Sequence, residues 1–550
     1  MAEHGGSTAV LDGRPELTDD LVGTGEPDQP EARGRGRLQK AGWALAGAAV
    51  LGVGYIPAAR VPIIADDFQA LQETFAITDG SLWEALTFGF SAGQQAGHSN
   101  PVGQSLGALY HYLAYWLSAT VGVSPQYYDV LATLAMIALG VAGAASTLVW
   151  GLRRLPALEV SFWPTFALLA AVTAATLQLH VPWSDDPVVS YGPAGWGSTA
   201  IGFWTIAWAL RATAPGNRDK RSIAICSALA AAGVWYYEML VASVAAVAVA
   251  LVLVALTAVD RRQVRSRCLV LMGTAVLLPA VMFVAGRVLL AVPSDEAGYG
   301  GTTLALGRAG VGAWGNGMLS ALPGGGWGYL TETAGPPVLD WDSLHLGAAL
   351  VLLVGGIGFA WVRSTGAGSL LSDVDRPRAA ERLPAWRSRW LVPVAALLVF
   401  WAGATATHAM TVKYSEKMAR PGQVYLSYAV GVVCVAALLV LALVALRRHR
   451  SARLLAVGLP LVGAFVLGQA TLNMTLADIT QTHYPVNARL VAQSVDGDVP
   501  EFVRCGTLFD WMTKQGWPEY YLVAVRDGVQ ENYERLHGEP FCAELDERTD

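Results

Sequence analysis

Two adjacent carboxylates, Asp66 and Asp67, are the residues in this sequence best suited to chemistry. They lie in the segment Ile64-Ala65-Asp66-Asp67-Phe68, a few residues after the first long apolar run. A carboxylate at the surface of a membrane can take a proton from a hydroxyl group that arrives from water. A solvated loop start would also place acids here at little cost, so at this point both interpretations stay open.

Other polar residues fall at similar boundaries of apolar runs. Asp185 and Asp186, in the segment HVPWSDDPVVSYG, could bind an acceptor or a divalent metal ion, or could form an ordinary turn before Pro187. His98 and Glu238 have the same two interpretations, as site residues or as side chains at the membrane surface. Two carboxylate pairs could hold Mg²⁺ or Mn²⁺, although their spacing specifies no ligand set.

Basic residues cluster in the segment MTVKYSEKMARPG, which follows an apolar run. Cations there could bind an anionic group such as a phosphate, or could anchor the chain to lipid headgroups. Arg287, which lies inside the end of another apolar run, could also bind such a group, or its side chain could snorkel to the surface. The candidates for phosphate binding are Lys413, Lys417, Arg420, His408 and Arg287.

The composition requires that most of the chain lie in lipid. Of 550 residues, 53% are hydrophobic and 15% are charged, whereas soluble globular chains carry about 25% charged residues. The net charge is −6, and the basic residues form short clusters between apolar runs. This pattern excludes nucleic acid as the expected partner and makes the lipid bilayer the expected one.

The apolar runs predict an all-α polytopic membrane protein with about eleven transmembrane helices, because a bilayer core needs about 20 apolar residues per helix. A run over 222–259 is too long for one helix, so we expect a tight hairpin with Glu238 at its tip. The predicted spans are 41–59, 127–150, 160–180, 194–211, 222–236, 238–259, 268–290, 344–362, 390–410, 424–446 and 454–474.

The distribution of Lys and Arg predicts the orientation. The loops that alternate with 60–126, 180–193, 236–238, 291–343 and 411–423 hold 24 basic residues near the spans, whereas these five loops hold five. Basic loops stay in the cytoplasm. The N-terminus is therefore expected in the cytoplasm and the C-terminus outside it, and merging 222–259 into one helix would move later basic loops to the wrong side.

We expect three parts along the chain. Residues 1–40 are polar and rich in Gly, Glu, Asp and Pro, which predicts a disordered cytoplasmic tail. Residues 41–474 form the transmembrane domain, whose outer loop 60–126 includes a predicted interfacial helix over 102–121. Residues 475–550 are polar and predict a small extracytoplasmic C-terminal domain.

The cysteines predict one disulfide. Cys505 and Cys542 are the cysteines outside the apolar runs, and their segment is expected to face an oxidising compartment. We therefore predict that they pair. Cys226, Cys268 and Cys434 lie in or beside apolar runs and are expected to be inert.

The order of these parts resembles the GT-C glycosyltransferases, which take sugars from polyprenyl-phosphate donors. A cytoplasmic N-terminus and one span are followed by the acidic pair in the first outer loop. The segment HSNPVGQSLGALYHYLAYWLSATVGVSPQYYDVLATL then leads into the second span. The resemblance covers about residues 41–474 and does not extend over 475–550.

The resemblance implies a GT-C-like fold and an inverting glycosyltransferase in which Asp66 or Asp67 is the general base. The donor would be a polyprenyl-phosphate-linked sugar, and the acceptor an extracytoplasmic cell-wall glycan, lipid or protein. A bias toward Ala, Gly, Val and Arg is typical of high-GC bacterial genomes and predicts a bacterial plasma membrane. The residues do not decide which aspartate is the base.

Two other classes compete with this interpretation. A membrane transporter or lipid flippase would carry charged residues in mid-helix and broken helices near the bilayer midplane, whereas the acids here gather at one face. A polymerase or ligase of lipid-linked glycans would place arginines and a histidine in one late outer loop. The loop 291–343 and its edge hold only Arg308 and His345 of these types, which makes that class the weaker alternative.

Overall fold

The computed structural model describes residues 30–91, 100–153, 160–180, 186–258, 261–290, 303–364, 383–446, 452–514 and 517–543. The chain divides into two units, Met1–Gly42 and Trp43–Asp550. Residues 1–29 of the predicted cytoplasmic tail lie outside the described residues, and 30–40 are the start of a helix. All contacts given below lie within the second unit.

The described residues form an all-helical protein, with one isolated antiparallel bridge between Leu304 and Thr411. The helices that correspond to the predicted spans are α1 (Pro30–Arg60), α5 (Pro125–Leu152), α6 (Phe162–Thr176), α7 (Ser198–Ala212), α8 (Arg221–Tyr236), α9 (Val241–Thr257), α10 (Arg261–Leu271), α11 (Leu278–Leu289), α14 (Trp341–Ser364), α15 (Leu383–Ala409), α17 (Ser427–Leu446) and α18 (Ala452–His483). The others are α2 (Ala65–Ile77), α3 (Leu82–Ser91), α4 (Pro101–Val121), α12 (Arg308–Ser320), α13 (Trp327–Ala334), α16 (Val412–Lys417), α19 (Asn487–Gln493), α20 (Glu501–Lys514) and α21 (Glu519–His537).

The chain is a multi-pass membrane protein. Among the described residues, eight helices are long and apolar enough to cross a bilayer. They are Gly36–Arg60, Pro125–Leu152, Glu238–Thr257, Arg262–Leu289, Trp341–Ser364, Trp390–Ala409, Ser427–Ala445 and Pro460–His483. The other three predicted spans correspond to the shorter helices α6, α7 and α8, so the count of eleven remains a prediction.

The helices that correspond to the predicted spans alternate in direction along the chain, with α10 and α11 counted as one continuous helix. Arg60, at the end of α1, forms an ion pair of 2.9 Å with Asp342 at the start of α14. At the opposite end, Arg267 of α10 donates a hydrogen bond of 2.8 Å to the Ala212 carbonyl at the end of α7. We call the end of the helix bundle near Arg60 and Asp342 the acidic end, because it holds Asp66. Found there are the ends of α1, α6, α8, α11, α15 and α18 and the starts of α5, α7, α9, α14 and α17.

The hairpin predicted within 222–259 is confirmed. Helix α8 ends at Tyr236, a short 3-10 helix covers Glu238–Leu240, and α9 begins at Val241. Ser227 of α8 donates a hydrogen bond to Thr274 of η3, the π-helical segment Met272–Leu277. Further along both helices, Trp235 donates one to the Met282 carbonyl of α11. Two helices that contact each other in this order run parallel, and α9, which lies between them in the chain, returns in the opposite direction.

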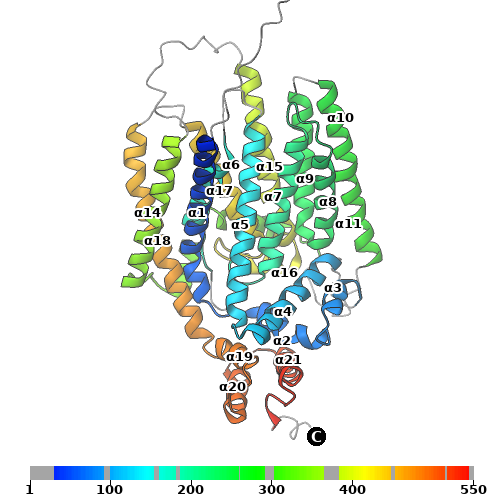
Figure 1. Cartoon of the computed structure of the whole chain (residues 1–550), viewed down its shortest axis with the longest axis vertical. Coiled ribbons are helices and arrows are strands. Elements are labelled where there is room, and N and C mark those ends of the chain that lie inside the picture. Colours follow the sequence, from blue (N-terminus) through cyan, green and yellow to red (C-terminus); the bar gives the residue numbers. More distant parts are fainter. Residues whose placement is uncertain are drawn as a thin grey trace, which may run out of the picture. The chain divides into compact units, whose positions relative to one another are not determined.

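Short helices cover the acidic end. The helix predicted over 102–121 is α4, which has Pro101 at its first position. It ends at Val121 and is followed by Gly122, whose φ is 71°. Helices α2 and α4 share one hydrophobic core with α19, α20 and α21. Figure 1 shows these five helices together, and α2 and α21 are in contact. Residues of 475–550 are thus packed directly against the segment 60–126.

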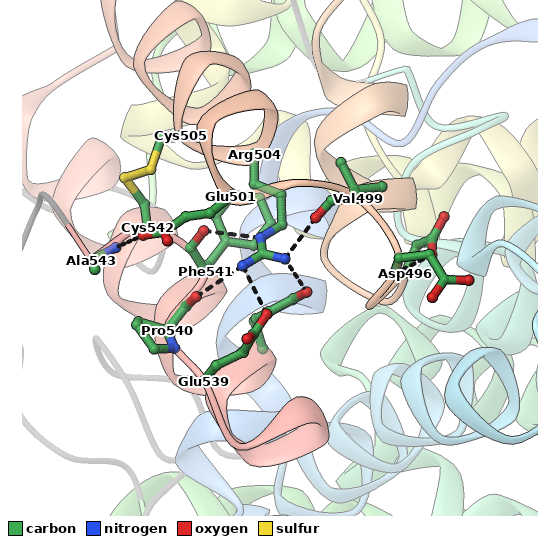
Figure 2. Close-up of polar contacts among 12 residues, drawn as sticks. Asp496, Val499, Glu501, Arg504, Cys505, Glu539, Pro540, Phe541, Cys542 and Ala543 are labelled. Carbon is green, nitrogen blue, oxygen red and sulfur yellow. Dashed lines mark hydrogen bonds and ion pairs between the residues drawn. A yellow bond between two sulfur atoms is a disulfide. The ribbon is translucent and has the colours of Figure 1, made fainter.

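The C-terminal helices are held by the predicted disulfide, which is confirmed. Cys505 of α20 and Cys542 are bonded, with their Cα atoms 5.0 Å apart. Beside them the buried Arg504 guanidinium donates hydrogen bonds to the carbonyls of Phe541 and Val499 (Figure 2). An Arg that is 3% exposed needs such acceptors, because an unpaired buried charge is strongly destabilising.

Candidate functional site

The acidic pair lies in the first turn of α2. This helix begins at Ala65, whose φ of 55° is in the left-handed region. The Asp66 side chain is exposed, whereas Asp67 is 7% exposed. Carboxylates are stabilised in the first turn of a helix, where unpaired N–H groups and the helix dipole favour negative charge. The two aspartates therefore have different surroundings although they are neighbours.

Tyr191 connects both carboxylates to the segment that precedes α7. Its hydroxyl donates a hydrogen bond of 2.6 Å to Asp66 Oδ2, and its backbone N–H donates to Asp67 Oδ2. The φ of Tyr191 is 59°, a conformation that L residues rarely adopt outside sites where the surroundings enforce it. Sequence analysis did not select Tyr191, although it lies in the segment HVPWSDDPVVSYG that was selected for its acids.

Aromatic rings lead from Tyr191 to the end of α15. The Tyr191 and Tyr425 ring centroids are 6.0 Å apart, and Tyr425 stacks on Tyr414 at 4.3 Å. The His408 ring lies 5.1 Å from that of Tyr425, and its Nε2 is 3.2 Å from the Tyr237 hydroxyl. We call these five residues the aromatic cluster. It is the part of the site that sequence analysis missed, apart from His408, because no local pattern brings these segments together.

Two of the predicted cations lie beside this cluster. Lys413 Nζ is 5.3 Å from the centroid of the Tyr414 ring, and Lys417 Nζ is 6.0 Å from it. Both belong to α16, which directly follows α15 in the chain. Cations at such distances are attracted to the face of a tyrosine ring. The structure thus brings Lys413, Lys417 and His408 into one neighbourhood that reaches the acidic pair through Tyr425 and Tyr191.

The other two predicted cations are in ion pairs. The Arg420 guanidinium donates two hydrogen bonds, of 3.2 and 2.5 Å, to the Glu332 carboxylate on α13, and this contact lowers the pKa of Glu332. Arg287 lies 3.1 Å from Glu238, where α8 turns into α9. Two residues predicted separately, one for a phosphate and one for an acceptor or metal, are therefore neighbours, and Tyr237 of the aromatic cluster precedes Glu238 in the chain.

Asp186 forms a turn. Its carboxylate accepts hydrogen bonds from the N–H groups of His180, at 2.7 Å, and Val188, at 2.9 Å, and it is 5% exposed. Its carbonyl accepts another from Ser190, at 2.7 Å. These contacts shape the backbone that leads to Tyr191, which matches the alternative of an ordinary turn. Asp185 and His98 lie outside the described residues.

A further buried acid, Asp129, lies near the acidic end at the start of α5. Tyr110 of α4 donates a hydrogen bond of 2.6 Å to Asp129 Oδ1. Burial, together with the charge of Asp129 and, to a smaller degree, that of Asp67, raises the pKa of Tyr110 well above its usual value. Tyr110 therefore stays protonated and can keep donating to the Asp129 carboxylate.

No metal cluster adds to the site in the described residues. Within these ranges, no group of three or more His, Cys, Asp or Glu side chains could hold a metal ion, and the expected Mg²⁺ or Mn²⁺ remains a prediction. A mainly apolar cavity of about 320 Å³ lies between α13 and α18 and is lined by Trp327, Thr331, Leu339, Leu467 and Leu472, among others. None of the predicted site residues lines it.

Comparison with protein-family models, curated proteins and solved structures finds no match to this chain. Its function must therefore be argued from the site itself.

Proposed function

We propose that the protein is a glycosyltransferase that moves a sugar from a polyprenyl-phosphate donor to a hydroxyl group of an extracytoplasmic acceptor. The observation that supports this most is the exposed Asp66 carboxylate, which is held by Tyr191 and connected through the aromatic cluster to Lys413 and Lys417. A proton acceptor on one side and cations on the other suit a transfer in which a hydroxyl attacks and a phosphate departs.

Asp66 is the better candidate for the base. A base must reach the proton of an acceptor that arrives from water, and Asp66 is exposed whereas Asp67 is buried against the Tyr191 backbone. Asp67 would then hold the loop that carries Tyr191, and the Tyr191 hydroxyl would orient the Asp66 carboxylate. This division of roles gives the two aspartates different mutational effects.

The proposed reaction is one displacement. The acceptor oxygen attacks the anomeric carbon from the face opposite the phosphate, while Asp66 takes the hydroxyl proton. The bond between the anomeric carbon and the phosphate oxygen breaks, its electron pair stays on that oxygen, and the configuration of the sugar inverts. Polyprenyl phosphate leaves without needing a proton, and Lys413 and Lys417 stabilise its charge.

The proposal includes a location and a topology. The acidic end would face outward from a bacterial plasma membrane, with eleven spans, a cytoplasmic N-terminus and an extracytoplasmic C-terminus. The count of basic residues in the loops supports this direction. A GT-C-like fold belongs to the same proposal, as does the class of acceptor, a cell-wall glycan, lipid or protein.

The proposal predicts that Asp66→Asn lowers transfer by roughly 10²–10⁴, because Asn keeps the size and hydrogen bonding of the side chain but cannot accept the proton. The measurement is mass spectrometry of polyprenyl-phosphate sugars in a deletion strain that carries each variant, since unused donor accumulates. Asp67→Asn, which can still accept the Tyr191 N–H, should lose less than about tenfold.

Glu84→Gln is a matched control, because Glu84 is an exposed acid in the first turn of the neighbouring helix α3. Unchanged transfer by Asp66→Asn, with protein present at normal levels, would remove the proposed mechanism.

A transporter or lipid flippase is the second candidate. The observation that favours it is the π-helical segment η3 inside the candidate span Arg262–Leu289, because π-bulges interrupt helices and often occur at functional sites. This candidate predicts movement of a substrate across vesicles without covalent change. Transfer that stops with Asp66→Asn would decide against it.

A further inference from the structure

The backbone that leads into the acidic pair is held by side chains from the C-terminal helices. Tyr521 of α21 donates a hydrogen bond of 2.8 Å from its hydroxyl to the Ala65 carbonyl. Asn487 of α19 donates one of 3.1 Å from Nδ2 to the Ile63 carbonyl. These contacts join residues more than 420 positions apart, since the sequence separations are 456 and 424.

Ala65, which accepts the hydrogen bond from Tyr521, has an unusual conformation. Ala65 has a φ of 55°, in the region that favours glycine, and directly precedes Asp66. A non-glycine residue stays in this region only where neighbouring contacts enforce it. Because the Ala65 dihedral angles set the direction in which α2 starts, they also set the position of the Asp66 carboxylate.

More contacts fix α2 against the same helices. Phe68 stacks on Trp511 of α20 with ring centroids 5.5 Å apart, and Asn532 of α21 donates a hydrogen bond to the Gln72 carbonyl. Gly528 of α21 packs so closely that an added Cβ would lie 2.7 Å from the Gln72 oxygen. One face of α2 is thus in contact with α20 and α21 over its first two turns.

The C-terminal helices are themselves cross-linked. The Cys505–Cys542 disulfide joins α20 to the segment after α21, and Arg504 of α20 bonds to Glu539 and the Pro540 carbonyl in that segment (Figure 2). Such cross-links make the surface that carries Tyr521 and Asn487 well defined.

We propose that the C-terminal helices position the catalytic carboxylate, with Tyr521 acting as a positioning residue through the Ala65 backbone and Asn487 through the Ile63 backbone. This inference rests on the proposed role of Asp66 for its effect on transfer. Its structural part, the control of the start of α2 by Tyr521, does not depend on that role.

The first test is hydrogen exchange of the purified protein with Tyr521→Phe. This variant removes only the hydroxyl that donates to Ala65 and keeps the ring, which stacks on Trp517. We expect the amides of peptide 61–77 to exchange about three- to tenfold faster, while those of 501–514 keep their rates. Tyr520→Phe is the matched control, because Tyr520 is adjacent and 74% exposed.

The second test is transfer kinetics with the same variants. Tyr521→Phe should lower kcat by about tenfold and leave the KM for the donor unchanged, because it displaces the base without removing a donor contact. In the Asp66→Asn background it should cause no further loss. A Tyr521 that only stabilised the fold would lower both backgrounds alike.

The two tests separate the two ideas. Unchanged exchange in 61–77 with Tyr521→Phe would overturn the positioning role, whatever the activity. Faster exchange there together with normal transfer by Asp66→Asn would leave the backbone contact intact as a finding, remove the proposed function and, with it, the catalytic part of this inference.

Discussion

Three non-glycine residues with left-handed φ lie at or beside α2. Ala65 and Tyr191 flank the acidic pair in space, with φ of 55° and 59°, and Asp79, with φ of 49°, follows the helix end. Such conformations cost about 1–3 kcal/mol each and persist where surrounding contacts over-determine them. Their concentration around one short helix is independent of the chemistry of Asp66 and Asp67, and it points to the same place.

The pKa of His111 on α4 gives a residue-scale prediction. Burial lowers its pKa from 6.5 to about 4, so the folded protein holds it neutral. Below pH 6.5 the unfolded chain binds the proton while the folded chain does not, and stability falls as the pH drops from about 6.5 toward 4. The loss should reach up to about 3 kcal/mol and then level off below the folded pKa.

The measurement for this prediction is thermal unfolding in detergent between pH 4 and 8. His111→Gln should remove most of the slope between pH 6.5 and 4, and His345→Gln, at an exposed position, should keep it. Equal slopes in both variants would show that His111 is charged or accessible in the folded state.

At the scale of elements, local patterns predicted some features and could not predict others. The hairpin near Glu238 and the disulfide followed from charge and cysteine placement, which are readable along the chain. The contact of α21 with α2 was not predicted, because residues 456 positions apart meet through shape and hydrogen bonds that leave no period in the sequence. The aromatic cluster has the same origin, because its five rings come from three separate parts of the chain, at 191, at 237 and between 408 and 425.

Loss of the Cys505–Cys542 disulfide should loosen the C-terminal helices. The bond closes a loop of 37 residues, and chain entropy alone predicts a stabilisation of about 3–4 kcal/mol. With Cys505→Ser/Cys542→Ser, the amides of α20 and α21 should exchange faster. The decrease in their opening free energy should approach the stabilisation that the bond supplies. The variant Cys226→Ser, at a buried free cysteine, is the control for loss of a thiol. Unchanged exchange in α20 would show that the Arg504 contacts suffice.

At the scale of the whole second unit, the direction of each long helix follows from contacts at its ends. The acidic end holds the helix ends that lie beside the loops poor in Lys and Arg, from Arg60 to Tyr425. Among the described residues, only eight of these helices are long and apolar enough to cross a bilayer. Helices α6, α7 and α8 are shorter, yet residues next to each of them make contacts at the acidic end, and the other end of α7 contacts α10 at the opposite end.

Eleven spans therefore predict a labelling pattern that eight spans would not give. Arg218, between α7 and α8, and Arg363, at the end of α14, should face the cytoplasm, whereas Arg308 and Lys514 should face outward; all four are exposed. Single cysteines at these positions, treated with an impermeant thiol reagent on intact cells, should react only at 308 and 514. The three native free cysteines are buried and the other two are bonded to each other, so the background should be low. Labelling at 363 alone would mean that α6, α7 and α8 do not cross the membrane, because eight spans with a cytoplasmic N-terminus put 218, 308 and 514 inside. Labelling at both 218 and 363, without 308 and 514, would reverse the orientation and would place Asp66 in the cytoplasm, where the proposed acceptor does not occur.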